Sequence, residues 1–206
     1  TLERRSIAVR RAEILFISDE VVSNATASGL YPALLRARNI PFGDPVSFQY
    51  RTFDVAPQIS QIMQRNPDVV ALAASPDGAN KALKELQRQG FRGRVVGSQI
   101  FADPNAVENF GPEGNGMIIV AGFWWDRNDA TREFTRKYAA ENARRGLTQK
   151  RIPHHTDAQG YDTVYLMKQV MERARVTGDP ARLAAERTAI RDAMAGITFT
   201  GVTGEN

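Results

Sequence analysis

Short apolar runs recur through the first 121 residues and are separated by segments with helical spacing. Most of these runs contain almost no polar residue, which is typical of strands covered on both faces of a parallel sheet. The predicted strands lie at 13–18, 45–51, 68–74, 94–97 and 117–121. Strands that alternate with helices predict an α/β fold, with a Rossmann-like parallel sheet and flanking helices.

The clearest unit of this pattern spans residues 66–99. Its first strand, 68–74, ends in a turn cluster, and the helix that follows at 79–89 has one apolar face and one charged face. Gly90 provides a C-cap for this helix, and a second strand follows at 94–97. A strand–helix–strand unit of about 30 residues has the size of a right-handed parallel crossover.

Three further short helices are predicted in this half of the chain. Pro32 interrupts any helix that continues from the first strand, so we expect a loop that leads to a helix at 32–38. Asp54 is placed to cap a helix at 55–65. Another helix is expected at 103–110, where an Asp-Pro pair opens the segment.

The second part of the chain is mostly helical. Helices are predicted at 130–145, 156–175 and 180–195, and a strand-like segment follows at 197–202. These patterns predict three parts. They are an α/β ligand-binding lobe at 12–122, a helical segment at 123–196 and a returning strand at 197–206.

Polar residues follow the third and fourth predicted strands. Ser75 and Pro76 come directly after the third strand, and Ser98 and Gln99 come after the fourth. Ligands of open parallel sheets lie beyond the carboxyl ends of the strands. The sequence therefore predicts a small-molecule site at these positions.

Trp124 and Trp125 mark the change between the two parts of the chain. One interpretation is packing at a hinge. The other is that one indole forms a wall of a cleft, since ligand clefts are lined by aromatic side chains and a few polar groups. In the second interpretation Trp124 contacts the ligand.

Composition limits the classes of function. Of the 206 residues, 42% are hydrophobic and 24% are charged, as in ordinary globular proteins. The net charge of +4 comes from scattered basic residues that are not interleaved with aromatic ones, so we predict no nucleic-acid binding. The absence of cysteine is compatible with both oxidising and reducing compartments.

Candidate catalytic and metal-binding sets are weak. His154 and His155 are the two histidines, and neighbours on a helix point about 100° apart, too far to clamp one metal ion. Asp19 and Glu20 form a pair of acids after the first strand, where we expect capping or solvation. We predict no enzymatic activity, no metal and no cofactor.

Five stretches of the chain carry recognisable motifs. They are 66–99, with its NPDVV opening, Glu113–Ile119, Glu133–Tyr138, Ala158–Val164 and Phe199–Gly204. Each stretch alone is weak, but together and in this order they resemble the branched-chain amino-acid (Leu/Ile/Val) type of ABC-transporter solute-binding protein. The resemblance covers roughly residues 50–204.

The resemblance implies a type I periplasmic binding fold, with two lobes joined by a hinge and a ligand between them. It implies a periplasmic protein that works with a membrane permease of an ABC transporter. It also implies that the chain is a fragment, in which the helices of the second part cover a lobe whose first strands are absent.

Two departures from the family pattern affect the expected ligand. After the first strand the family carries an aromatic residue over the ligand, whereas the sequence here is Asp19-Glu20-Val21-Val22, so Asp19 and Val22 are the candidates at this point. Gln99 falls where amino-acid-binding relatives carry a carboxylate that pairs with the ligand's ammonium group. A neutral amide favours a small carboxylate without an amine, aromatic ones included, unless other residues replace that charge.

We therefore expect capture of an amino acid or small carboxylate without chemical change. The alternative is a ligand-sensing effector domain of a regulator or receptor with the same fold. A fused DNA-binding or kinase domain would favour the alternative, and neighbouring permease genes would favour transport.

Overall fold

The computed structural model describes residues 8–102, 110–149 and 151–205. The chain divides into two compact units, Thr1–Ala121 and Gly122–Asn206, which are called the first and second units below. The helix predicted at 103–110 falls almost wholly outside the described residues. Within the described residues, no helix is both long enough and apolar enough to cross a bilayer.

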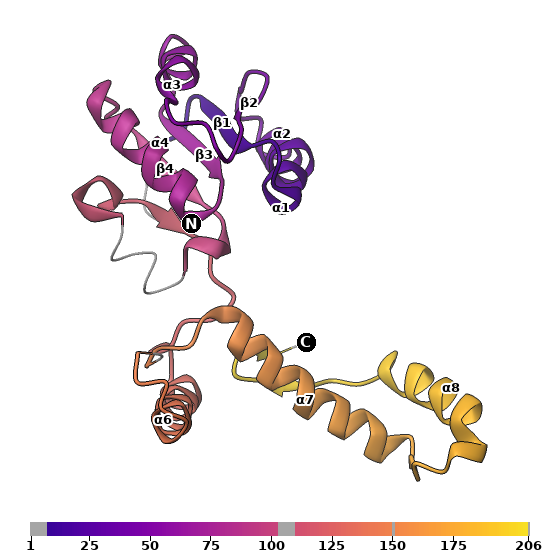
Figure 1. The fold of residues 1–206 in the computed structure, drawn as a ribbon. Helices are drawn as coiled ribbons and strands as arrows, with labels where there is room; N and C mark the ends of the chain where they lie inside the picture. Colours follow the sequence, from indigo (N-terminus) through magenta and orange to yellow (C-terminus); the bar gives the residue numbers. More distant parts are fainter. Residues whose placement is uncertain (1–7, 103–109, 150, 206) are drawn as a thin grey trace. The chain divides into compact units, whose positions relative to one another are not determined.

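The first unit contains a five-stranded sheet in which all neighbouring strands are parallel (Figure 1). The strand order is β2-β1-β3-β4-β5. The strands are β1 Ala12–Ile17, β2 Val46–Phe48, β3 Val69–Ala73, β4 Arg94–Gly97 and β5 Ile118–Ile119. This topology confirms the predicted Rossmann-like α/β fold.

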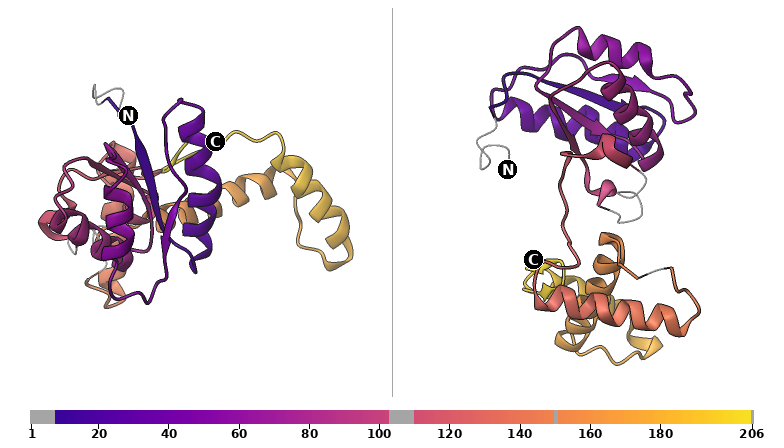
Figure 2. Two further views of the ribbon diagram at one scale, coloured as in Figure 1. Left: turned by 90° about the horizontal axis from the view of Figure 1, so that it is seen from above. Right: turned by 90° about the vertical axis from the view of Figure 1, so that its left-hand side faces the viewer.

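Helices cover both faces of this sheet, as the two views in Figure 2 show. Helices α3 (Ala56–Met63) and α4 (Pro76–Arg88) cover the face that carries Leu15 and Leu72. The opposite face carries residues such as Ile14 and packs against the helical segment that follows β1. Burying an aliphatic side chain of this size contributes about 1.5–3 kcal/mol, so the two apolar layers hold the sheet in place.

Helix α4 begins at Pro76, earlier than predicted. Ser75 has the extended backbone of an N-cap residue, and Pro76 occupies the first turn, where its missing N–H removes no helical hydrogen bond. The helix ends as predicted, because Gly90 has a φ of 81°.

The segment after β1 differs from the prediction. No loop precedes Pro32: the chain is helical through α1 (Val21–Ala25), a π-helical turn η2 (Thr26–Leu30) and α2 (Tyr31–Arg36). In the π-helical turn the N–H of Tyr31 donates to the carbonyl of Thr26, five residues earlier. This wider turn accommodates the ring of Pro32, which would collide with the carbonyl four residues earlier in a regular helix.

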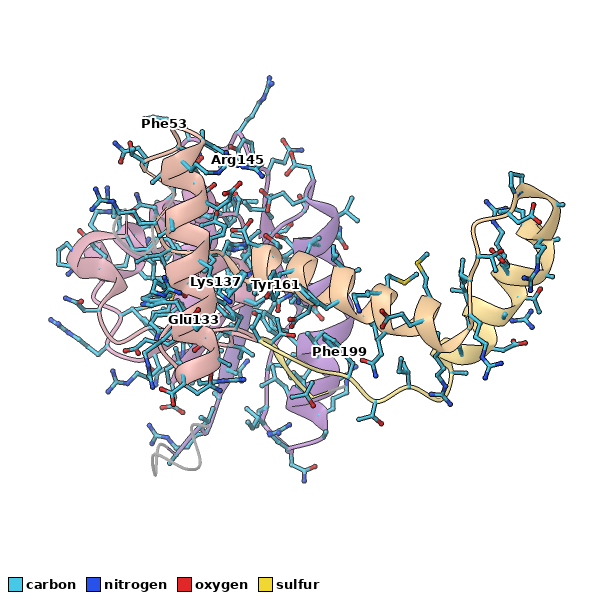
Figure 3. All side chains as sticks on the ribbon, turned by 90° about the horizontal axis from the view of Figure 1, so that it is seen from below. Phe53, Glu133, Lys137, Arg145, Tyr161 and Phe199 are labelled. Carbon is cyan, nitrogen blue, oxygen red and sulfur yellow. The ribbon has the colours of Figure 1, made fainter. Side chains whose placement is uncertain are left out.

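In the part that the structure describes, the second unit is built from three α-helices and one hairpin. The helices are α6 Asp129–Arg144, α7 His155–Arg173 and α8 Leu183–Met194, the last preceded by the short η5 turn Pro180–Arg182. A small core of Phe123, Phe134 and Ala158 joins α6 to α7. Figure 3 shows Glu133 and Lys137 on α6, where they form an ion pair of 3.4 Å.

The predicted strand at 197–202 is shorter in the structure. Only Thr200–Gly201 forms a strand, β6, and it pairs antiparallel with β7, Gly204–Glu205. The buried carboxylate of Asp162 on α7 accepts hydrogen bonds from the backbone N–H groups of Val202 and Thr203, at 2.9 and 2.8 Å. The hairpin is therefore fixed to α7 by one side chain.

Candidate functional site

The carboxyl ends of β1, β3 and β4 lie side by side, because β3 pairs with both of the other strands in parallel register. Residues that follow these strands therefore meet at one edge of the sheet, which we call the carboxyl edge. Asp19 follows β1, Ser75 follows β3, and Ser98 and Gln99 follow β4. The structure thus brings together the predicted site residues of the first unit.

Glu20 joins two of these strand ends. Its Oε2 atom accepts a hydrogen bond from the backbone N–H of Ser75 at 2.9 Å and another from the hydroxyl of Ser23 at 2.8 Å. The hydroxyl of Ser75 is buried and has no hydrogen-bond partner within the described residues. The backbone N–H of Ser75 is therefore bonded to the carboxylate of Glu20, and the hydroxyl of Ser75 is turned into the protein interior.

Gln99 is exposed at the end of β4, where it begins a short 3₁₀ turn, η3 (Gln99–Phe101). Its side chain has no hydrogen bond within the described residues. Phe101 is fully buried beneath this turn, and a Cβ atom at Gly97 would collide with its ring. The turn that carries Gln99 is therefore supported by a buried ring, while the amide of Gln99 is exposed.

The remaining predicted residues of the first unit lie on the same edge. Asp19 is exposed, and its Oδ1 atom accepts a hydrogen bond from the backbone N–H of Tyr50 at 2.8 Å, which fixes the loop after β2. Val22 is 69% exposed in the first turn of α1. Pro76 is half-buried and opens α4.

An open hollow of about 490 Å³ adjoins the carboxyl edge between the loop after β2 and helix α4. Its lining residues are Tyr50, Arg51, Asp77, Asn80, Lys81 and Lys84. The ammonium group of Lys81 donates to the backbone carbonyls of Tyr50 and Thr52, at 3.3 and 3.1 Å. Lys81 therefore holds the loop after β2 in place. The hollow adds polar and charged side chains next to the carboxyl edge.

Trp124 belongs to the second unit, so its part in the site stays a prediction. Its side chain is 42% exposed and stacks on Trp125, with ring centroids 3.6 Å apart and an interplanar angle of 29°. Both the hinge-packing and the cleft-wall interpretations are compatible with a stacked, half-exposed pair.

The candidate metal-binding groups do not form a cluster of metal ligands within the described residues. The described residues contain no group of three or more His, Asp or Glu side chains placed to hold a metal ion. His154 forms the N-cap of α7, with its Nδ1 atom 2.8 Å from the hydroxyl of Thr156. The carboxyl edge can bind polar groups of a ligand through the hydroxyl, amide and carboxylate groups that follow its strands.

A comparison with protein-family models matches residues 10–206 to the family described as periplasmic binding protein. The chain belongs to the periplasmic binding protein family. The comparison with curated proteins gave no match.

Solved structures of solute-binding proteins share this fold. A leucine binding protein LivK from Thermotoga maritima matches with a TM-score of 0.79 and 17% identity, over 98% of this chain and 54% of that one. A solute binding protein of an ABC transporter from R. palustris, in complex with benzoate, gives 0.75 and 20%, over 99% and 52%. LivJ from Streptococcus pneumoniae, in complex with isoleucine, gives 0.69 and 16%, over 96% and 52%. The chain thus spans about half the length of these structures.

The sequence did not predict the contact between Glu20 and Ser75. The carboxylate was assigned to capping or solvation, and the structure shows that it also reaches a residue 55 positions later in the chain. The available signal was an acid shortly after a buried parallel strand, because ligands of open α/β sheets bind beyond the carboxyl ends of the strands.

Proposed function

We propose that this chain is part of the extracytoplasmic, periplasmic solute-binding component of an ABC transporter. It captures an amino acid or a small carboxylate, aromatic ones included, in a cleft between two lobes. The carboxyl edge of the first unit supplies one wall of that cleft. The observation that carries the proposal is the convergence of Asp19, Ser75 and Gln99 at one edge, within a chain of this family.

The structural neighbours support this range of ligands. They are a leucine binding protein and complexes with isoleucine and benzoate, and all three compounds are small solutes with a carboxylate and an apolar body. The carboxyl edge offers matching groups, because the exposed amide of Gln99 can donate or accept a hydrogen bond and Val22 presents an exposed apolar side chain.

We propose that the chain binds this solute reversibly and does not transform it. A ligand that bridges two lobes favours the closed arrangement about the hinge, and a membrane permease then distinguishes the closed form from the open one. In this scheme residues 12–122 form the ligand-binding lobe, residues 123–196 cover the other lobe, and residues 197–206 return toward the hinge. Helix α7 exposes apolar side chains such as Val164 and Tyr165, which supports the proposal that this helix packs against the other lobe.

A thermal-shift screen of the whole protein tests the proposal. The panel contains the proteinogenic amino acids and small carboxylates that include benzoate. A ligand present at 100 times its Kd stabilises the native state by about 2.7 kcal/mol, which raises the melting temperature by several degrees. A panel in which no compound changes the melting temperature would refute the proposed function.

A further inference from the structure

The hollow between helix α4 and the loop after β2 gathers positive charge that the proposed function does not use. Three of its lining residues are cationic, namely Arg51, Lys81 and Lys84, and one is acidic, Asp77. Three cations and one carboxylate leave the lining with a formal charge of +2 at neutral pH. The volume of about 490 Å³ lies within the range of small-molecule sites.

The protein itself does not neutralise this charge. Within the described residues, none of the three cations forms an ion pair. The exposed side chains of Arg51 and Lys84 also have no hydrogen bond in this part of the chain. Helix α6 shows the usual alternative, since Arg136 pairs with Glu133 one turn away at 2.7 Å. Unpaired like charges around one hollow repel one another, and a bound anion would remove that repulsion.

The cations come from two separate elements. Asp77, Lys81 and Lys84 follow one another on α4 at spacings of four and three residues, which places them on one face of the helix. The loop after β2 contributes Tyr50 and Arg51. A ligand in the hollow would therefore meet positive charge from both the helix and the loop.

Hydrogen bonds fix the loop before any ligand arrives. The backbone N–H of Tyr50 donates to Oδ1 of Asp19 at 2.8 Å, and the backbone N–H of Gln49 donates to the hydroxyl of Thr52 at 3.1 Å. Lys81 donates to the carbonyls of Tyr50 and Thr52, which leaves one of its three N–H groups for a ligand. A loop that is ordered in advance loses little conformational entropy on binding.

The other polar groups of the lining limit the chemistry of the ligand. The hydroxyl of Tyr50 donates to Oδ2 of Asp77 at 3.4 Å, so this carboxylate is partly satisfied. The Oδ1 atom of Asn80 is buried and lacks a hydrogen-bond partner among the described residues, so it can accept a hydrogen bond from a hydroxyl group. The matching ligand is an anion with several charged oxygens and a hydroxyl group nearby.

We propose that this hollow is a second binding site, specific for a phosphate group and separate from the solute site at the ends of β3 and β4. A phosphate monoester carries a charge of about −1.5 to −2 at neutral pH and three strong acceptor oxygens, which matches a lining of +2 with donors from two elements. A carboxylate offers one charge and two oxygens, and matches less well.

The phosphate group can belong to a small molecule or to a lipid headgroup. Phe53 separates these two sources, because its side chain is 97% exposed and lies two residues after Arg51. A lipid surface would bury this ring among its acyl chains, whereas a small phosphate compound in the hollow would leave it exposed.

Isothermal titration calorimetry of the whole protein tests the site, with inorganic pyrophosphate and inorganic phosphate as probes in a phosphate-free buffer of low ionic strength. We expect saturable binding that weakens with added sodium chloride, because salt screens these exposed charges. Arg51→Gln and Lys84→Gln should each weaken the binding by about ten-fold. Arg92→Gln is the matched control, because Arg92 is also exposed and unpaired but precedes β4 at the opposite edge of the sheet, and it should leave the binding unchanged.

Sedimentation with lipid vesicles then identifies the source of the phosphate. The vesicles contain phosphatidylglycerol and phosphatidylcholine in equal parts. Vesicle binding that Phe53→Ser reduces several-fold, with pyrophosphate binding unchanged in this variant, assigns the site to lipid headgroups. Binding of the soluble probes without binding of vesicles assigns it to small phosphate compounds.

Three results would overturn the proposal. The first is the absence of saturable binding to pyrophosphate, phosphate and vesicles alike. The second is binding that neither Arg51→Gln nor Lys84→Gln weakens. The third is mutual exclusion in calorimetry between pyrophosphate and the solute found in the thermal-shift screen, because the probe would then occupy the solute site. None of these results contradicts the proposed function, and phosphate binding remains measurable even if the screen finds no solute.

Discussion

Glu13 provides the sharpest test of how the sheet is held at the edge opposite the proposed site. Its carboxylate is fully buried in β1 and contacts Arg65 at 2.6 Å, Arg11 at 2.9 Å and the backbone N–H of Gly43 at 3.2 Å. One side chain thus joins β1 to the loop before β2 and to the segment after α3. We predict that Glu13→Gln destabilises the protein substantially.

The size of this destabilisation depends on how deeply Glu13 and its two arginine partners are buried. Breaking a buried ion pair by removing one partner costs about 3–5 kcal/mol. The side chains of Arg65 and Arg11 are 22% and 37% exposed, so water can partly solvate them once the carboxylate is gone. We therefore expect a loss of about 2–3 kcal/mol in the free energy of unfolding.

Urea denaturation followed by circular dichroism measures this loss. With a slope of about 1–3 kcal/mol per molar urea, the transition midpoint should fall by about 1 M. Glu141→Gln is the control, because that carboxylate forms only exposed ion pairs with Arg144 and Arg145, and no measurable shift is expected. A loss below about 0.5 kcal/mol for Glu13→Gln would refute this reasoning.

Three further predictions test other contacts. Burial raises the pKa of Tyr31 to about 12, so its contribution to stability is complete below pH 10 and is lost as the pH rises toward 12. Tyr31→Phe, which also loses the hydrogen bond to the carbonyl of Leu72, should show less pH dependence of its unfolding free energy in that range. An alkaline stability profile identical to that of the wild type would contradict this. Asp162→Asn should loosen the β6–β7 hairpin, seen as faster hydrogen exchange of residues 200–205, whereas unchanged exchange would rule out the anchoring role. Gly97→Ala should lower the melting temperature by several degrees because the new methyl group collides with Phe101, and a wild-type melting temperature would show that this turn repacks freely.

Patterns within single segments predicted the architecture well. The apolar run at 68–74 became β3, whose five residues are all buried, because a strand covered on both faces must be apolar throughout. The prediction at Pro32 was wrong because the usual rule considers a regular helix, and a π-helical turn removes the steric conflict. The local sequence gives little indication of such a turn.

Contacts between distant residues limited the prediction of the site. The carboxyl edge followed from the predicted parallel strands, but the hydrogen bond between Glu20 and Ser75 depends on side-chain reach across two strand ends. The buried orientation of the Ser75 hydroxyl could not be deduced from its position after a strand either. The sequence thus located the edge, and the structure identified which groups face outward from it.

The central claim is that the carboxyl edge of the first unit binds a small solute. The most direct measurement is an NMR titration of the whole protein with the tightest ligand of the screen. We predict that the amide signals of Glu20, Ser75 and Gln99 shift together and saturate at the Kd measured by calorimetry, while the signal of Gly43 at the opposite edge stays in place. Saturable shifts confined to residues away from Glu20, Ser75 and Gln99 would contradict the account.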